Sequence, residues 1–169
     1  MSLVPFETLP ASARVWIFAC SRPLAGREAE RLLGEVDHYL DHWQAHGHPL
    51  TCGRAWRDDR FLAIGVDQTD AYASGCSIDG LFRALQSLQS TLGATIVSAG
   101  QVHYRDGSGQ IHTVSRDEFT ALSAAGAITA TTPVFDATIA TAGDWRARFE
   151  TVVGRAWHKA LLDPAGVKG

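Results

Sequence analysis

A chain of 169 residues, 46% hydrophobic and 20% charged, is long enough to bury a core and has the composition of a folded globular protein. Its net charge is −3 and its arginines are scattered, which argues against a basic face for nucleic acid. The apolar runs are too short to span a bilayer, so we expect neither a nucleic-acid nor a membrane partner.

The cysteines indicate a reducing compartment. Cys20, Cys52 and Cys76 are odd in number and widely spaced, which is not the pattern of a secreted disulfide framework. The N-terminus also lacks the cationic and apolar segments of a signal peptide. The sequence therefore predicts free thiols and a cytoplasmic location.

The first half of the chain predicts alternating strands and helices. Residues 14–20 are β-branched and aromatic, which is typical of a buried strand. Apolar residues at three- and four-residue intervals predict a helix from about Leu24 to Ala45 and another from about Ile78 to Leu92. Between them, Asp58-Asp59 joins two candidate strands into a hairpin. A strand within residues 95–105 would complete β-α-β-β-α-β, the ferredoxin-like order.

The second half predicts a hairpin, a short helix, a strand and a final helix. The hairpin turns at Asp106-Gly107, and Ser115 with Glu118 forms a capping box at the start of the short helix. A strand follows at residues 133–139, and apolar spacing predicts a helix over 144–162. We expect an α+β fold with a mixed or antiparallel sheet, one domain over 1–169, and a candidate seam near 93–100.

The most promising stretch for chemistry is Ala73-Ser74-Gly75-Cys76-Ser77-Ile78-Asp79, where a polar loop becomes a helix. Free N–H groups and the helix dipole favour an anion there, either a thiolate or a bound phosphate, sulfate or carboxylate. The candidate ligand-binding residues are Arg60, Ser74, Gly75, Ser77 and Asp79. The alternative is that Ser74 or Ser77 is a helix cap, Asp79 a first-turn charge and Cys76 a small buried hydrophobe.

A catalytic set can be assembled around this helix start. Cys76 would be the nucleophile, His46 the base and Asp67 the group that orients the base, if the loop folds toward the end of the first helix. The known cysteine-enzyme patterns are missing, because Phe82 stands where a phosphatase has arginine and Arg83 comes one residue later. No C-x-x-C motif is present either. Whether the protein is an enzyme is therefore left open.

His38, His42 and His46 are spaced by four residues, as metal ligands on a helix are. On a helix of about 100° per residue they flank the apolar face, so we expect His38 and His42 to be solvated. We assign no metal site. The sequence also lacks the G-x-x-x-x-G-K-[ST] and G-x-G-x-x-G phosphate-binding motifs, so we expect no nucleotide or other cofactor.

The chain resembles a family of small, uncharacterised bacterial proteins. The resemblance rests on the SGCSID motif, on Trp43-Gln44-Ala45-His46-Gly47, and on further short matches along most of the chain: Pro49-Leu50, Arg60-Phe61, Val66-Asp67 and Trp157-His158-Lys159. Members are often named ABC transporter ATPases, although this sequence has no phosphate-binding loop and is short for such a domain. The resemblance implies no particular activity.

A second resemblance covers residues 102–139, whose order of hairpin, helix, turn and strand is similar to that of GYF-type peptide-binding modules. The Gly-Pro and aromatic platform of those modules have no counterparts around Gln110 to Val114.

Two functions follow as hypotheses. The first is a small-molecule or anion-binding protein, with thiol-dependent catalysis as an option, whose site is the loop and helix start at 67–79. The alternative is a non-catalytic module whose C-terminal half binds a protein, a peptide or a second copy of the chain.

Overall fold

The computed structural model describes residues 3–69, 71–96 and 100–162. The chain divides into two compact units: unit 1 is Met1–Ser98 with Ile139–Ala147, and unit 2 is Ala99–Thr138 with Arg148–Gly169. The boundary falls in the predicted seam at 93–100, of which residues 97–99 lie outside the described part; the single domain stays a prediction. Helices and antiparallel sheets confirm the α+β class. No helix in the described ranges has the length and apolar character needed to cross a membrane.

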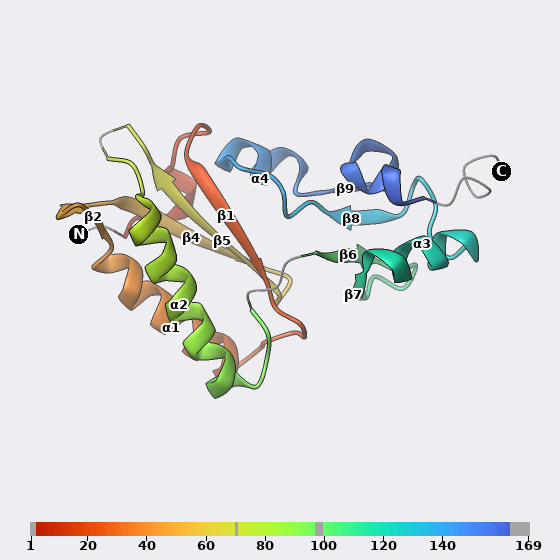
Figure 1. Cartoon of the computed structure of the whole chain (residues 1–169), viewed down its shortest axis with the longest axis horizontal. Helices are drawn as coiled ribbons and strands as arrows, with labels where there is room; N and C mark the ends of the chain where they lie inside the picture. Colours follow the sequence, from red (N-terminus) through yellow and green to blue (C-terminus); the bar gives the residue numbers. More distant parts are fainter. Residues whose placement is uncertain (1–2, 70, 97–99, 163–169) are drawn as a thin grey trace. The chain divides into compact units, whose positions relative to one another are not determined.

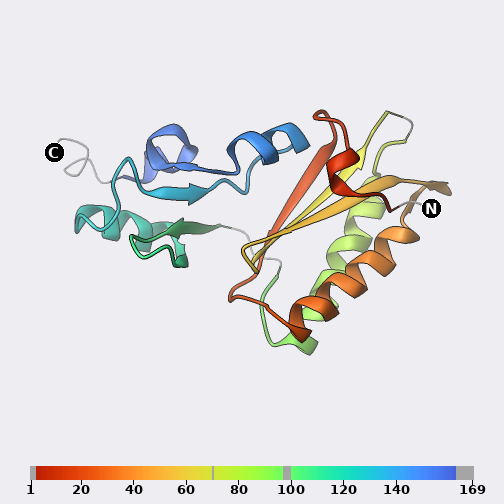
Figure 2. The same ribbon diagram turned by 180° about the vertical axis from the view of Figure 1, so that it is seen from behind.

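Unit 1 is built on a three-stranded antiparallel sheet of order β1-β5-β4, comprising β1 (Arg14–Ala19), β4 (Thr51–Arg57) and β5 (Phe61–Asp67). The central strand β5 is a nearly continuous apolar run, as expected for a strand covered on both faces. Leu62, Ile64 and Val66 pack on the side of the two long helices, whereas Ala63 joins a cluster with Phe6 and Leu9. Figures 1 and 2 show helices α1 (Arg27–Asp41) and α2 (Gly75–Leu92) side by side on one face of this sheet.

The order of elements in unit 1 follows the ferredoxin-like expectation through its first three strands and two helices. The predicted fourth strand is wrong for this sheet: it forms β6 (Gln101–Arg105), which pairs with strands of unit 2. Residues 140–142 return to the outer edge of β1 instead, where the Val15 N–H donates to the Ala140 carbonyl at 2.8 Å. Residues 140–142 therefore cover the edge of β1 without forming a full strand. Strand β6 pairs with two strands of the second sheet.

The first helix is shorter than predicted. It ends at Asp41, and the chain then forms two short paired strands, β2 (Gln44–Ala45) and β3 (His48–Pro49). His46 and Gly47 make the turn between them with φ of 53° and 79°, the left-handed pair that a two-residue hairpin needs. His46 is thus on a hairpin turn and not on the helix with His38 and His42.

Unit 2 holds a four-stranded antiparallel sheet of order β7-β6-β8-β9, formed with β6 by β7 (Ile111–Ser115), β8 (Pro133–Phe135) and β9 (Glu150–Val152). The predicted hairpin and short helix are confirmed. Helix α3 (Arg116–Ala124) is capped by the Ser115 hydroxyl, which accepts from the Glu118 N–H. The fully buried Phe119 packs on the sheet residues Val102 and Val134.

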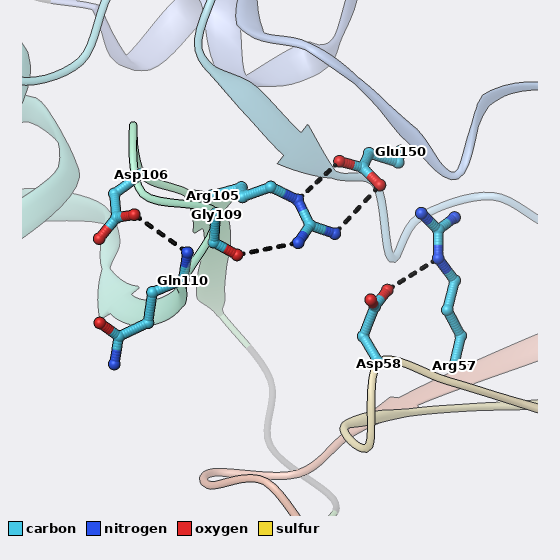
Figure 3. Close-up of polar contacts among 7 residues, drawn as sticks. All are labelled: Arg57, Asp58, Arg105, Asp106, Gly109, Gln110 and Glu150. Atoms are coloured by element: carbon cyan, nitrogen blue, oxygen red, sulfur yellow. Dashed lines mark hydrogen bonds and ion pairs between the residues drawn. The ribbon is translucent and has the colours of Figure 1, made fainter.

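Arg105 fixes the centre of this second sheet. Its guanidinium donates to both carboxylate oxygens of Glu150 on β9, at 3.0 and 3.3 Å, and to the Gly109 carbonyl at 2.9 Å (Figure 3). The same group lies over the Phe135 ring, 5.3 Å from its centroid. One side chain thus joins the hairpin, β8 and β9.

The predicted C-terminal helix over 144–162 is wrong. The chain forms a short helix α4 (Ala142–Arg148), strand β9, and two 3₁₀ segments at Val153–Arg155 and Trp157–Leu161. Thr151, Val152 and Val153 are a β-branched run, which favours a strand, and β8 offers an edge for them to pair with. Local β preference and a free sheet edge therefore outweigh the helical spacing of the apolar residues.

Candidate functional site

The helix start that the sequence singled out is formed as a capped N-terminus. Ser74 is the cap of α2, and its hydroxyl oxygen accepts from the Ser77 N–H at 3.2 Å. The Ser77 hydroxyl in turn donates to the Ser74 carbonyl at 2.7 Å. The first N–H groups of a helix have no carbonyl partner within it. The Ser74 hydroxyl satisfies the N–H of Ser77, so the N–H groups of Gly75 and Cys76 are left without a partner inside the helix. They are the donors available to an anion.

This helix start opens into a surface depression of about 560 Å³ in unit 1. One wall is the end of α1 with the hairpin that follows it, and the other is the first three turns of α2. Figures 1 and 2 show the β2–β3 hairpin and the start of α2 at the same end of the unit. The lining residues are His38, Tyr39, His42, Trp43, Gln44, His46, Ser74, Cys76, Ser77, Gly80 and Arg83.

The depression therefore brings together two of the predicted catalytic residues, Cys76 and His46. It also contains two of the predicted ligand-binding residues, Ser74 and Ser77. Gly75 is exposed at the first position of the same helix. The predicted proximity of the loop to the segment after the first helix is present, although His46 reaches it from a turn.

Charge in the depression is one-sided. Arg83 and three histidines are the ionisable nitrogen groups of its lining, and none of the described lining residues is acidic. This contrasts with the whole chain, whose net charge is −3. Together with the positive end of the α2 dipole, the lining favours a negatively charged group.

Trp43 holds the two walls together. Its side chain is 3% exposed, and its indole N–H donates to the Ser77 carbonyl in the first turn of α2 at 2.9 Å. The ring also contacts Tyr39 and Trp16, with centroids 6.3 and 6.4 Å away. The position of the Cys76 backbone relative to the hairpin thus depends on one buried aromatic residue.

The environment of Cys76 differs from that of the other two cysteines. All three thiols are free, but Cys76 is exposed whereas Cys20 and Cys52 are buried. Burial raises the pKa of each of the latter two thiols to about 12. Since the thiolate is the reactive form, Cys76 is the one thiol of the chain that a reagent at neutral pH can reach and modify.

Asp67 and Arg60 do not join this site. The Asp67 carboxylate accepts from the Thr69 N–H and hydroxyl at 3.0 and 2.6 Å, which lowers its pKa and closes the turn after β5. Arg60 precedes the other end of β5, a strand about 20 Å long. Its guanidinium is largely buried and donates to the Ser21 carbonyl. The proposed set of Cys76, His46 and Asp67 is therefore incomplete, and Arg60 has a structural role.

Asp79 also lies outside the depression as described. It is exposed at the fifth residue of α2, just past the first turn in which the sequence placed it. Ser74 is the helix cap, as the alternative interpretation allowed, and Ser77 lies inside the first turn with its hydroxyl bonded to the Ser74 carbonyl.

His38 and His42 are solvated, as predicted, and their rings lie 5.0 Å apart. Nδ1 of His42 lies 2.9 Å from the His38 carbonyl oxygen and donates to it, because a carbonyl oxygen can only accept. No group of three or more histidine, cysteine or acidic side chains in the described residues is placed to hold a metal ion.

Three residues of the lining were not predicted from the sequence: Arg83, Tyr39 and Trp43. The signal for Arg83 was helical spacing: Cys76, Gly80 and Arg83 are residues i, i+4 and i+7 of one helix, which places them on one face. The phosphatase pattern, in which arginine stands one position earlier, does not use this helical spacing. For Tyr39 and Trp43, apolar spacing indicated core positions and gave no separate signal.

Comparison with known protein families, curated proteins and solved structures found no match. The resemblances to the small bacterial family and to GYF-type modules stay predictions.

Proposed function

We propose that the protein binds a small molecule through an anionic group at the start of α2. The observation that carries the proposal is the lining of the depression, which contains Cys76 at the start of α2, Arg83 and three histidines, and in which no described residue is acidic. A phosphate, sulfate or carboxylate would accept from the Gly75 and Cys76 N–H groups and pair with Arg83.

The same geometry supports a role for the thiol. Cys76 is exposed beside the proposed anion position, and His46 and His42 line the same depression as candidate bases. A ligand bound by its anionic group would present its remainder to this sulfur. The proposed function therefore includes thiol chemistry of Cys76 on the bound molecule.

The interaction-module hypothesis has no comparable support. Among the described residues, the one exposed large hydrophobic side chain is Tyr72, which belongs to unit 1. The surface that the GYF-type resemblance pointed to is therefore without a large exposed apolar anchor within residues 100–138.

Alkylation of Cys76 tests the proposal in the wild-type chain, because the other two thiols are buried. We expect iodoacetamide to label Cys76 alone, and inorganic phosphate or sulfate at constant ionic strength to slow the labelling. Replacing Arg83 with Gln is expected to weaken the protecting anion about tenfold, since a charged hydrogen bond contributes about 1.5–3 kcal/mol. The measurement is the labelling rate by mass spectrometry as a function of anion concentration.

Arg27→Gln is the matched control. Arg27 is exposed on α1 outside the lining of the depression, so this substitution removes the same charge at a different place. It should leave the protection unchanged. If phosphate and sulfate do not protect Cys76, or if both arginine variants lose protection equally, the proposed site is wrong.

A further inference from the structure

The proposed anion-binding depression adjoins a groove between the two helices of unit 1. A second depression, of about 380 Å³, runs between α1 and α2 and shares the residues His38 and Tyr39 with the first. Its lining comes from the middle and C-terminal part of α1 and from the middle and C-terminal part of α2. From Cys76 to Leu88 the continuous path along α2 is about 18 Å, at 1.5 Å per residue.

The groove has an apolar floor and a polar rim. Val36, Leu81 and Leu85 form the floor with exposures of 2%, 1% and 1%, so they lie recessed beneath the surface. The polar residues of the lining are Arg31, Glu35, His38, Ser87 and Thr91. A flat bilayer surface would meet the rim before it reached the floor, whereas a single narrow chain can enter.

We infer that the ligand is a free amphiphile, with an anionic head at the start of α2 and an apolar chain along the α1–α2 groove. The inference rests on the proposed function and names its ligand class. Charge complementarity sets the direction, because the depression with Arg83 and without acidic residues holds the head, and the groove with the leucine floor holds the chain. Burying each methylene of such a chain favours binding about fourfold.

Tyr39 lies where the two depressions meet. Its hydroxyl occupies the space over Gly80, where an added Cβ would lie within 2.4 Å of the oxygen. Glycine at this position therefore lets the tyrosine hydroxyl pack against α2.

The test compares octyl phosphate, below its micellar concentration, with inorganic phosphate by isothermal titration calorimetry on the full chain. Burial of even three methylenes predicts that octyl phosphate binds about fiftyfold more tightly. In Ala84→Phe a ring fills the groove, so this ratio should fall to within about threefold while inorganic phosphate still binds. Gln86→Phe adds the same ring at an exposed position outside the described lining and should keep the wild-type ratio.

The outcomes separate the two proposals. If inorganic phosphate binds and octyl phosphate binds no more tightly, the amphiphile inference is overturned and the proposed function remains. If neither binds, the proposed function itself fails. Binding to anionic vesicles without binding to monomeric octyl phosphate would also overturn the inference, because it would make the membrane surface the partner.

Discussion

Replacing Trp43 with alanine is expected to lower the free energy of unfolding of unit 1 by about 3–5 kcal/mol, the usual cost of removing a fully buried large aromatic ring. Trp43 is 3% exposed, contacts two other aromatic rings, and donates to the Ser77 carbonyl. Because this residue joins the hairpin to the start of α2, the variant should also lose anion protection of Cys76. Urea denaturation and the labelling rate measure the two effects.

Trp43→Phe separates packing from the hydrogen bond. It retains an aromatic ring but cannot donate to Ser77, so we expect a loss of about 1 kcal/mol from that bond, with a smaller packing loss added. Anion protection should weaken but persist. An alanine variant as stable as the wild type, or one that keeps full protection, would show that Trp43 does not hold the site together.

The second large effect is an acid destabilisation of unit 2 caused by His158. The side chain is 1% exposed, and its Nδ1 has no hydrogen-bond partner among the described residues. Burial lowers the pKa of this imidazole from 6.5 to about 4, against a smaller opposing effect of Asp136. The folded state therefore resists a proton that the unfolded chain accepts.

The pH window follows from these two values. Above about pH 6.5 His158 is neutral in both states and costs nothing, whereas between pH 6.5 and about 4 only the unfolded chain takes up the proton. Stability should fall by about 3 kcal/mol across this window, at about 1.4 kcal/mol per unit of pKa difference. Below about pH 4 the folded state is protonated too, and His158 adds no further loss.

Native-state hydrogen exchange of the Val134 and Phe135 amides, at pH values from 7.5 to 4, measures this effect in the sheet of unit 2. In His158→Leu the fall in stability should be smaller by about 3 kcal/mol, since leucine binds no proton. Other titrating groups affect both proteins alike and cancel in the comparison. An unchanged pH dependence in the variant would mean that His158 is not buried as a neutral group.

Much of the local structure could be predicted because short sequence signals determine it. Ser74 and Ser115 cap their helices, Asp58-Asp59 turns a hairpin with two left-handed residues, and the apolar run of β5 is buried on both faces. In each case the residues that carry the signal are adjacent in the chain. Tertiary contacts then reinforce the local preference.

The errors arose where two signals competed over longer distances. The apolar spacing before His46 suggested a continuing helix, but the His46-Gly47 pair favours a two-residue turn and ended it. In the tail, the β-branched residues around Val152 found a sheet edge that only the folded unit 2 provides. The strand β6 likewise joined a sheet whose other members lie later in the chain.

Some residues that line the depression could be predicted from the sequence, and others could not. Cys76 and the cap at Ser74 were recognised from the helix start, and His46 was placed near them. Arg83 was recoverable from helical spacing alone, whereas Trp43 and Tyr39 required the packing of α1 against α2. Asp67 and Arg60 lie near each other in sequence, but at opposite ends of an extended strand.

An anion bound at the start of α2 would be detected by the backbone N–H groups of Gly75 and Cys76, which have no partner inside the helix. We predict that titrating phosphate against chloride at constant ionic strength shifts the amide resonances of these two residues in ¹H–¹⁵N spectra, with saturation. The phosphate affinity obtained from these shifts should fall about tenfold in Arg83→Gln and stay unchanged in Arg27→Gln. If the amide resonances of Gly75 and Cys76 do not move, or move only with ionic strength, then no anion binds at the start of α2.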